Sequence, residues 1–523
     1  MEILEKYSEA LELYHMKKFD AALKLVKELE VAAPNWKKSF LLEVFIRRDQ
    51  GEAIEELSLL EKLLPRLNFH SAQEKDLAAD AFNCLGSVNR FLGRTAESVR
   101  AFCLSASLSD DNRKACEEIS NALFAASTSE NFSAAAFRVF YDEYKKYLSD
   151  IVPYPKKFYA HKKIRVGFLS GSFQWHVVMA WSWHLLSDFD RNFFKVFCYS
   201  NVKTPDEVTN HFRSSIENWR DIYDLTDEAA AKLIRDDEID ILFDLDGHTA
   251  DNRLRVAAYR PAPIQISGVG YMNSTGLDCF DYFLSDVHCA GDENFFTEKV
   301  IKLPHSHICY ESPTKLEPAA FPPCLKNNFV TFGSFNHFGK MTDSMLMAWK
   351  KILDAVQGSR LILKHKIFRN DDGKNFVCER LKNFGFNLSR VEMRPYTDNH
   401  LVEYGDIDIA LDTFPYTGGV TTCEALYMGV PVISLYGSRH GTRFGLSILK
   451  NIGLEGFATN SYDGYFNLAI ALANDWELLK ILRKNLRTMM KKSPLMDSES
   501  YISEVEETFM KILYDERRAF HDR

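Results

Sequence analysis

Between residues 162 and 495, short apolar runs rich in β-branched and aromatic residues alternate with stretches of helical length, and the series occurs twice. The first run is KIRVGFLS at 163–170, and the second series begins with NFVTFGSFN at 328–336. Short buried strands separated by helices are typical of parallel, doubly wound sheets. A proline-rich segment at 316–328 separates the two series. We therefore expect two Rossmann-like α/β halves, at 162–315 and 329–495, joined by a hinge.

Two such halves form a cleft, and ligands of open α/β sheets bind at the carboxyl ends of the strands. This two-sheet arrangement is the GT-B architecture, which many nucleotide-sugar transferases and a few epimerases and phosphorylases use. The pattern by itself therefore favours a nucleotide ligand.

Residues 1–126 are expected to be helical throughout, since proline occurs there only at positions 34 and 65. The segments 17–34 and 84–111 share one pattern, with small residues at helix turns and crossings. A more degenerate helix pair is expected between them, at about 40–66. The pattern resembles the tetratricopeptide repeat, a helix pair of about 34 residues whose stacking forms a concave surface for a peptide. An ordinary helical bundle is the alternative. A helical linker is expected at 127–161 and a final helix at 496–523.

Charge and cysteine usage narrow the functional classes. The chain has 64 Lys and Arg against 73 Asp and Glu, a net charge of −9, which disfavours nucleic-acid binding. Charged residues recur through the first fifteen positions, so we expect no secretory signal. No run of eighteen apolar residues occurs, so we expect no membrane-spanning helix. The ten cysteines form no CxxC spacing. We interpret them as reduced thiols of a cytoplasmic protein.

The segment DTFPYTGGVTTCEALYMGVPV at 412–432 contains the strongest ligand signal. A strand ends at Asp412, a turn with two glycines follows, and a helix then begins. Glycines allow close approach of the backbone, and the first amides of a helix bind anions. The candidate diphosphate residues are Gly419, Val420, Thr421 and Thr422, and Glu424 is expected to accept hydrogen bonds from ribose. A threonine-capped helix after a tight turn is the alternative.

Other candidates lie at strand-to-helix junctions. Lys340 in SFNHFGKMTD can neutralise a diphosphate leaving group, and His400 in TDNHLVEYGD can contact a base. In the first half, His176 and His248 are candidates for proton handling. Each of these side chains has an alternative role as a surface, capping or structural residue. Asp244 and Asp246 imitate a metal-binding DxD motif, which we discount because they end a buried strand.

With these residues considered together, the chain resembles the O-linked N-acetylglucosamine transferase and SPINDLY family of protein glycosyltransferases (family 41), of a bacterial type with a short tetratricopeptide region. The resemblance spans nearly the whole chain. It depends on RPAPIQISGVGYMNSTGLDCFDYFLSD at 260–286, SFNHFGK at 334–340, the DNH step ending at His400, and LDTFPYTGGVTTCEALYMGVPV at 411–432.

The resemblance implies an inverting, metal-independent transfer from a nucleotide sugar to Ser or Thr hydroxyls of proteins. It implies that Lys340, with His337 nearby, contacts the diphosphate, that His400 contacts the base and that His176 is the active-site histidine. It also implies that the loop at 270–276 touches the donor sugar. The loop candidates, with His248 beside them, are Gly270, Tyr271, Asn273, Ser274 and Thr275.

Two segments depart from the animal transferases. Gly419, Val420 and Thr421 stand where those enzymes have His-Thr-Thr, and the loop GYMNSTG is nearer to that of SPINDLY proteins, which transfer fucose from GDP-fucose. UDP-GlcNAc is our first choice of donor and GDP-fucose the alternative. A sugar-nucleotide epimerase and a non-catalytic repeat scaffold are the rivals. We expect no metal or other cofactor, protein acceptors held by the repeats, and a homodimer as one assembly.

Overall fold

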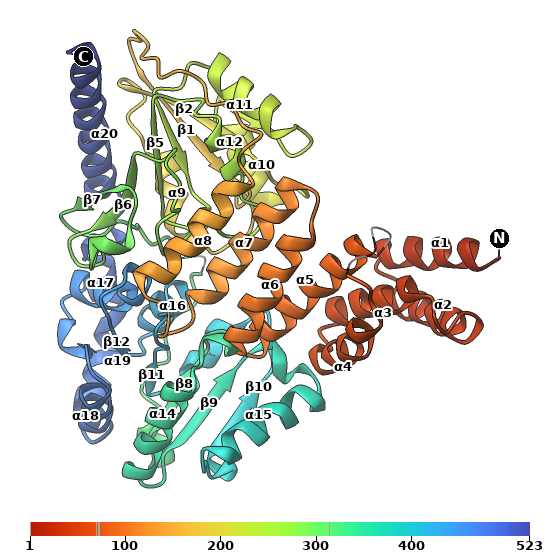
Figure 1. Ribbon diagram of the computed structural model, residues 1–523. Helices are drawn as coiled ribbons and strands as arrows, with labels where there is room; N and C mark the ends of the chain where they lie inside the picture. Colours follow the sequence, from red (N-terminus) through yellow and green to blue (C-terminus); the bar gives the residue numbers. More distant parts are fainter. Residues whose placement is uncertain (1, 70, 72–73, 313, 523) are drawn as a thin grey trace. The chain divides into compact units, whose positions relative to one another are not determined.

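The computed structural model describes residues 2–69, 71, 74–312 and 314–522. The chain divides into two compact units. Unit 1 comprises residues 1–129, 334–353 and 360–398, and unit 2 comprises residues 130–333, 354–359 and 399–523. Figure 1 labels most of the helices and strands of both units.

Unit 1 begins with consecutive helices that pack against one another in sequence, as the composition of this region predicts. The pair expected at about 40–66 is present as α3 and α4. The helices are α1 (Glu2–His15), α2 (Phe19–Ala32), α3 (Lys37–Gln50), α4 (Ala53–Leu63), α5 (Lys75–Phe91), α6 (Thr95–Leu108) and α7 (Asn112–Ala126).

Small residues set the spacing of these helices. A Cβ atom at Gly86 would lie 2.7 Å from the Phe102 ring, so α5 and α6 can cross this closely only with glycine there. Gly93 has a φ of 76°, a left-handed conformation that glycine adopts at low cost, and it makes the turn between the same helices. Between α1, α2 and α3, the buried residues Ala10, Ala22 and Val26 form part of one apolar cluster.

Unit 1 also contains the beginning of the second α/β series. Strands β9 (Arg360–Lys364) and β10 (Val391–Arg394) pair in parallel, and helices α14 (Asp343–Ala355) and α15 (Asp371–Asn383) belong to the same segment. The Phe91 ring contacts His337 and His365, and the Arg94 guanidinium lies over the Phe376 ring. Because these contacts join the segment to the helical repeats, the expected half at 329–495 is shared between the two units.

Unit 2 contains a seven-stranded parallel sheet in the order β3-β2-β1-β4-β5-β6-β7. The order reverses direction at β1 and β4, the type of position where open sheets bind ligands. In register, Val166 pairs with Val196 on one side and Ile241 on the other. The strands are β1 (Ile164–Ser170), β2 (Phe194–Ser200), β3 (Asn218–Asp221), β4 (Ile241–Asp244), β5 (Ile264–Gly268), β6 (Tyr282–Asp286) and β7 (Lys299–Leu303).

Helices α9 (Met179–Ser187), α10 (Glu207–Ser215), α11 (Asp227–Asp236) and α12 (Leu254–Ala258) connect these strands. One core cluster packs α11 and α12 against β1, β2 and β4 through Leu169, Phe197, Ile234, Leu242 and Val256. The doubly wound fold expected for this half is confirmed. Strand β3 was not predicted, because its sequence NWRD carries no apolar pattern.

A second group of parallel strands in unit 2 pairs in the order β8-β11-β12-β13. The strands are β8 (Thr331–Ser334), β11 (Ile409–Leu411), β12 (Val432–Leu435) and β13 (Ala458–Thr459), and β13 was not predicted. The helices of this part are α13 (Cys324–Asn327), α16 (Val420–Tyr427), α17 (Phe444–Asn451), α18 (Tyr462–Ala473), α19 (Trp476–Lys491) and α20 (Ser498–His521). The second α/β half is thereby confirmed as parallel.

The C-terminal helix α20 returns to the first sheet of unit 2. The Phe509 ring lies 6.1 Å from both the Phe189 and Phe243 rings, and Arg517 Nη2 donates to Asp240 Oδ1 at 2.9 Å. Within residues 127–161, where a helical linker was expected, helix α8 (Ala134–Lys146) is followed by extended chain. Tyr154 N donates to Tyr259 O at 2.7 Å, which holds that extended chain to unit 2.

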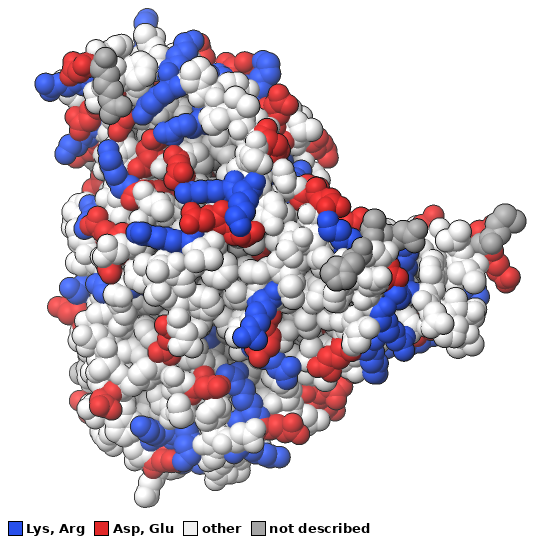
Figure 2. Space-filling model, viewed as in Figure 1, with Lys and Arg blue, Asp and Glu red and all other residues white. Residues whose placement is uncertain are grey.

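The described residues include no helix long and apolar enough to cross a membrane. On the face shown in Figure 2, basic and acidic side chains are interspersed. Ion pairs between basic and acidic side chains include Lys75 with Asp110 and Arg255 with Asp150.

Candidate functional site

Unit 2 has a pocket of about 470 Å³ that brings predicted site residues of both α/β halves together. His176 comes from the segment after β1, and His400, Val420 and Glu424 come from the second half. The remaining lining residues are Trp175, Val177, Met179, Ala180, Trp183, Val208, Glu311 and Ser312. A concave, mostly apolar wall with a few convergent polar groups is the usual form of a small-molecule site.

Helix α16 begins at the pocket, and Asp412 shapes the turn before it. Asp412 Oδ1 accepts from Gly418 N at 2.6 Å and Thr413 N at 2.8 Å, and its Oδ2 accepts from Ser434 Oγ at 2.7 Å. A Cβ at Gly418 would lie 2.5–2.9 Å from Thr422 Oγ1, Thr421 Oγ1 and Asp412 Oδ1, so only glycine fits there.

The first backbone N–H groups of α16 precede the hydrogen bonds that run within the helix. Gly419 is the N-cap and has no side chain to cap the helix, and the backbone bonds begin with Thr422 N to Gly419 O at 3.0 Å. The amides at Val420 and Thr421 precede that bond. A helix start without a side-chain cap can bind an anion through these amides and its partial positive charge.

His400 and Glu424 form a direct pair at the same wall. His400 lies at the start of the 3-10 turn η6 (His400–Asp406), and its Nε2 is 3.1 Å from Glu424 Oε1. The Tyr404 hydroxyl, from the same turn, donates to Thr421 O at 3.2 Å. These two bonds hold η6 against α16, so that the imidazole and the carboxylate present one polar edge to the pocket.

His176 also lines the pocket, and its side chain is exposed. The Val178 amide donates to its Nδ1 at 3.3 Å. In the neutral ring the proton is therefore on Nε2, which can donate toward a ligand. Partial desolvation lowers the pKa of His176 below its ordinary value, against a smaller opposite effect of the Asp251 carboxylate. The imidazole is accordingly neutral near pH 7.

Residues 271–276 of the loop at 270–276 are buried, and Glu298 organises the loop. Glu298 accepts from Ser274 Oγ at 2.6 Å and from Thr275 N at 2.8 Å, and the Thr275 hydroxyl also donates to it. Both hydroxyls that the sequence suggested for sugar contact thus point to a structural carboxylate. Gly270 fits under Leu245, whose carbonyl oxygen would lie 2.1 Å from any Cβ there. Tyr271 and Asn273 of the same loop are also buried.

His248 lies inside unit 2 beneath this loop. It is 1% exposed, and its Nε2 donates to Thr275 O at 2.7 Å. Its ring contacts Tyr141, Tyr144 and Tyr271. Burial lowers its pKa to about 4, so the ring is neutral. These contacts favour a role in supporting the loop, and direct sugar contact by His248 stays a prediction.

Asp244 and Asp246 are fully buried and are not among the residues lining the pocket. Asp246 accepts from Ser170 Oγ and Ser172 Oγ, and Asp244 accepts from Ser267 Oγ. Burial raises the pKa of Asp246 to about 7 and that of Asp244 to about 6. Carboxylates enclosed by protein donors are poorly suited to a substrate-bound metal, which supports the interpretation of DLD as structural.

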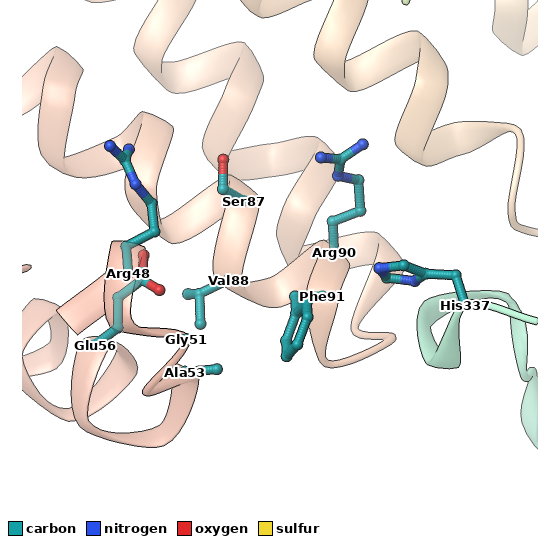
Figure 3. A pocket seen from close by; sticks show the side chains of 9 residues that line it. All are labelled: Arg48, Gly51, Ala53, Glu56, Ser87, Val88, Arg90, Phe91 and His337. Atoms are coloured by element: carbon teal, nitrogen blue, oxygen red, sulfur yellow. The ribbon is translucent and has the colours of Figure 1, made fainter. Parts of the chain in front are cut away.

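Lys340 and His337 belong to unit 1, in the turn η3 (Phe338–Lys340) and its cap. His337 lines a separate cavity of about 200 Å³ in unit 1 (Figure 3). The cavity's other lining residues are Arg48, Gly51, Ala53, Glu56, Ser87, Val88, Arg90 and Phe91. Burial and the neighbouring His365 and Arg90 hold the pKa of His337 well below its ordinary value. The cavity opens between helices of the repeat region.

Sequence reasoning missed several residues of the site. Trp175 and Trp183 supply apolar surface to the pocket, and Trp183 stacks on His211 at 5.1 Å. Tryptophans at helical spacing look like core residues in a sequence, although Trp175 is 69% exposed. Glu311 and Glu298 lie in segments without a motif. Trp175 is next to His176 in the sequence, and this adjacency is the one signal that the sequence offered for these residues.

Comparison with known proteins identifies the family. The sequence profile of Glycosyl transferase family 41 matches residues 146–313 and 323–505. A probable UDP-N-acetylglucosamine–peptide N-acetylglucosaminyltransferase SPINDLY from Solanum lycopersicum is 37% identical over 382 residues, which cover 71% of this chain and 40% of that protein. The probable UDP-N-acetylglucosamine–peptide N-acetylglucosaminyltransferase SEC of Arabidopsis thaliana is 27% identical over 67% of this chain and 37% of its own length.

A solved structure matches nearly the whole chain. A mutant of the Thermobaculum terrenum O-GlcNAc transferase has a TM-score of 0.86 and 26% identity, covering 99% of this chain and 98% of that chain. The two plant relatives are longer, and this chain spans well under half of their length. The match confirms the fold expected from the sequence, with helices followed by two parallel α/β halves.

Proposed function

Because this chain belongs to glycosyltransferase family 41, we propose that it is an inverting protein O-glycosyltransferase. It transfers a sugar, with GlcNAc from UDP-GlcNAc as the first choice, to Ser or Thr hydroxyls of protein acceptors. One observation carries this proposal: a single pocket joins His176 of the first half to His400, Glu424 and the start of α16 in the second half. The names of the plant relatives support the choice of UDP-GlcNAc.

The polar wall of the pocket suits a nucleoside diphosphate. The first amides of α16 and the Thr421 and Thr422 hydroxyls would bind phosphate oxygens, and Glu424 would accept hydrogen bonds from ribose. His400, held by Glu424 at 3.1 Å, would contact the base. The exposed Trp175 and the half-buried Trp183 offer flat apolar surfaces, which suit a ring ligand.

The transfer itself is a single displacement. The acceptor oxygen attacks the anomeric carbon, the bond from that carbon to the diphosphate oxygen breaks, and the nucleoside diphosphate leaves with the electron pair. Negative charge then grows on the diphosphate, where preorganised donors contribute most. We assign this stabilisation to the α16 amides and to the Lys340 ammonium.

His176 would orient the reactants. Its Nδ1 already accepts the Val178 amide hydrogen, so the neutral ring presents an Nε2 hydrogen to the pocket. This tautomer donates a hydrogen bond to the acceptor or donor sugar. The acceptor hydroxyl's proton leaves to solvent or, if the bond to Val178 opens, to this ring.

The repeats would dock the acceptor chain. The cavity of unit 1 combines the aromatic Phe91 with the charged Arg48 and Arg90 and the carboxyl group of Glu56, which suits an extended peptide with polar side chains. We also infer a cytoplasmic location, because none of the ten cysteines, all of which the structure describes, is in a disulfide and seven of them are buried. The expected homodimer stays a prediction that sedimentation analysis would test.

The decisive experiment is a transfer assay with two donors. The purified protein is incubated with cell lysate and either UDP-GlcNAc or GDP-fucose, and protein-linked sugar is measured by mass spectrometry. Labelling with UDP-GlcNAc alone supports the first choice, and labelling with GDP-fucose alone establishes the alternative. If neither donor labels protein while the folded chain binds partners, it is a scaffold. Interconversion of the free sugar nucleotide without protein labelling would establish the epimerase.

Two controls accompany the assay. A His400→Ala variant should lose labelling, whereas His305→Ala, at an exposed histidine paired with Glu504, should keep it. The reaction should also proceed without added Mg²⁺ or Mn²⁺. If the reaction requires added Mn²⁺, Asp244 and Asp246 become candidate metal ligands in the mechanism.

A further inference from the structure

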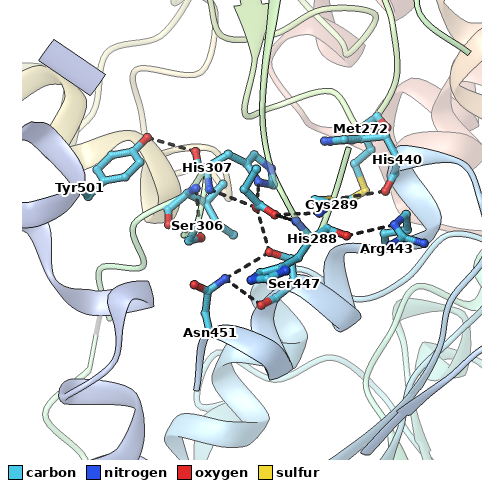
Figure 4. A network of polar contacts seen from close by, with 12 residues as sticks. Met272, His288, Cys289, Ser306, His307, His440, Arg443, Ser447, Asn451 and Tyr501 are labelled. Carbon is cyan, nitrogen blue, oxygen red and sulfur yellow. Dashed lines mark hydrogen bonds and ion pairs between the residues drawn. The ribbon is translucent and has the colours of Figure 1, made fainter. Parts of the chain in front are cut away.

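Three buried side chains with metal-binding donors converge in unit 2, away from the residues lining the pocket (Figure 4). Cys289 follows β6, His307 follows β7, and His440 begins the turn η7 (His440–Thr442) after β12. The Cys289 sulfur and one ring nitrogen of each histidine all lie within 4.8 Å of one another. Each of the three residues is at most 1% exposed.

Hydrogen bonds fix the orientation of both imidazoles. His307 Nδ1 donates to Asp286 Oδ2 at 2.5 Å, and His440 Nδ1 donates to Met272 O at 3.0 Å. Carboxylate and carbonyl oxygens only accept here, so each Nδ1 carries its hydrogen. The Nε2 atom of each ring is buried and has no hydrogen-bond partner among the residues that the structure describes. Two buried polar atoms that lack partners require an explanation in a native fold.

Asp286 is fully engaged in holding this arrangement. Besides His307, its carboxylate accepts from Cys289 N at 2.7 Å, from His288 N at 2.8 Å and from Ser447 Oγ at 2.8 Å. A carboxylate that orients a histidine through Nδ1 while Nε2 stays available is the usual outer support of a metal ligand.

Aromatic rings enclose the two imidazoles. Phe283 and Phe296 lie 5.1 and 5.8 Å from the His440 ring, and Phe444 lies 5.1 Å from the His307 ring. The Cys289 thiol donates weakly to His440 O, at 3.6 Å.

We propose that Cys289 Sγ, His307 Nε2 and His440 Nε2 bind one Zn²⁺ ion. Thiolate and imidazole donors match the preferences of zinc, and three protein ligands leave one position for a further donor. On binding, the thiol releases its proton and a sulfur–zinc bond forms, without any change in oxidation state. The donor atoms, which lie within 4.8 Å of one another, would close around the ion.

Such an ion would have a structural role. It would tie the segments after β6 and β7 to the turn η7 of the second half, and through Met272 to the loop at 270–276. Tyr501 from α20 adds a bond to this junction, because its hydroxyl donates to His307 O at 3.1 Å. The proposed transfer step does not involve this ion, so either proposal can fail without the other.

The test uses the full chain, expressed with zinc in the medium and desalted before elemental analysis. We expect about one zinc per chain, consistent with a ligand set that binds tightly when folded. Cys289→Ser and His440→Gln should each lose most of the zinc. Cys198→Ser, at another fully buried cysteine of unit 2, should keep it. Circular dichroism establishes that each variant is folded.

Cobalt gives a second readout that needs no variant. The wild-type chain expressed with Co²⁺ should show the intense charge-transfer absorption of a thiolate–cobalt bond, and its melting temperature should exceed that of metal-free protein. Absence of both zinc and cobalt from folded wild-type protein overturns the proposal. Zinc retained at full occupancy in folded Cys289→Ser and His440→Gln also overturns it.

Discussion

His400 Nε2 lies 3.1 Å from Glu424 Oε1, so that the turn before β11 and the first turns of α16 share one polar contact at the pocket wall. The two residues are 24 positions apart in sequence. If they act on the same nucleotide, their contributions to its binding must depend on each other.

The first prediction concerns this pair. Glu424→Ala should weaken UDP binding at least tenfold, while Glu424→Gln, which keeps an acceptor for ribose, should weaken it less. In a cycle with His400→Ala, the coupling free energy should be about 1 kcal/mol, because residues in contact are rarely additive. Isothermal titration with UDP measures all four proteins. Strict additivity would contradict a joint role.

Lys340→Ala should lower kcat by about 100-fold or more, the scale seen when one donor that stabilises developing charge is removed. Donor turnover at saturating UDP-GlcNAc measures this change. The matched control is Lys326→Ala, at an exposed lysine of α13, which should leave kcat unchanged. An unaltered kcat in Lys340→Ala would remove this lysine from the mechanism.

His176 should give the reaction an acidic limit that lies below the ordinary histidine pKa. Because partial desolvation lowers its pKa, the neutral, Nε2-donating ring persists from alkaline pH down through neutrality. Activity should therefore be level near pH 7 and fall only on the acid side, when Nδ1 becomes protonated and loses the Val178 bond. His176→Gln, measured over the same pH range, should remove that acid limb. An identical pH profile in the variant would exclude His176 as its source.

Glu298→Gln should disturb the loop at 270–276 without changing the part of the pocket that is proposed to bind the nucleotide. The carboxylate accepts three hydrogen bonds from Ser274 and Thr275, and an amide can accept only part of them. We expect a loss of about 1–3 kcal/mol in the free energy of unfolding and a raised KM for the nucleotide sugar. UDP affinity should be unchanged. Glu293→Gln, at an exposed position, is the control, and a lower UDP affinity in Glu298→Gln would contradict the assignment.

Glu56 should make unit 1 less stable as the pH rises. Burial raises its pKa from 4.5 to about 8, an effect that the Arg48 charge only partly offsets. Between these values the unfolded chain is ionised while the folded side chain holds its proton, so the free energy of unfolding falls with pH. The slope approaches about 1.4 kcal/mol per pH unit. Urea unfolding of Glu56→Gln should show a flatter pH dependence from pH 5 to 8, and an unchanged slope would contradict the raised pKa.

Much of the fold was predictable because it is encoded locally. The segments that form β1, β4, β8 and β12 are short apolar runs in the sequence. The turn before α16 can also be recognised in the sequence, from its two adjacent glycines. Small residues were expected at helix crossings, and Gly86, which packs against the Phe102 ring, is one of them. Strands β3 and β13 were missed, since a short edge strand needs no apolar pattern of its own.

The site was predictable only in part, for a physical reason. Local sequence marks where strands end and helices start, which was enough to nominate His176, His400 and Glu424 as neighbours of a ligand. Glu298 under the sugar loop, and Cys289 beside His440 from 151 positions away, carry no local signal. Their proximity arises when the halves of unit 2 pack, because burial and hydrogen bonding select partners by distance in space and not by separation along the chain.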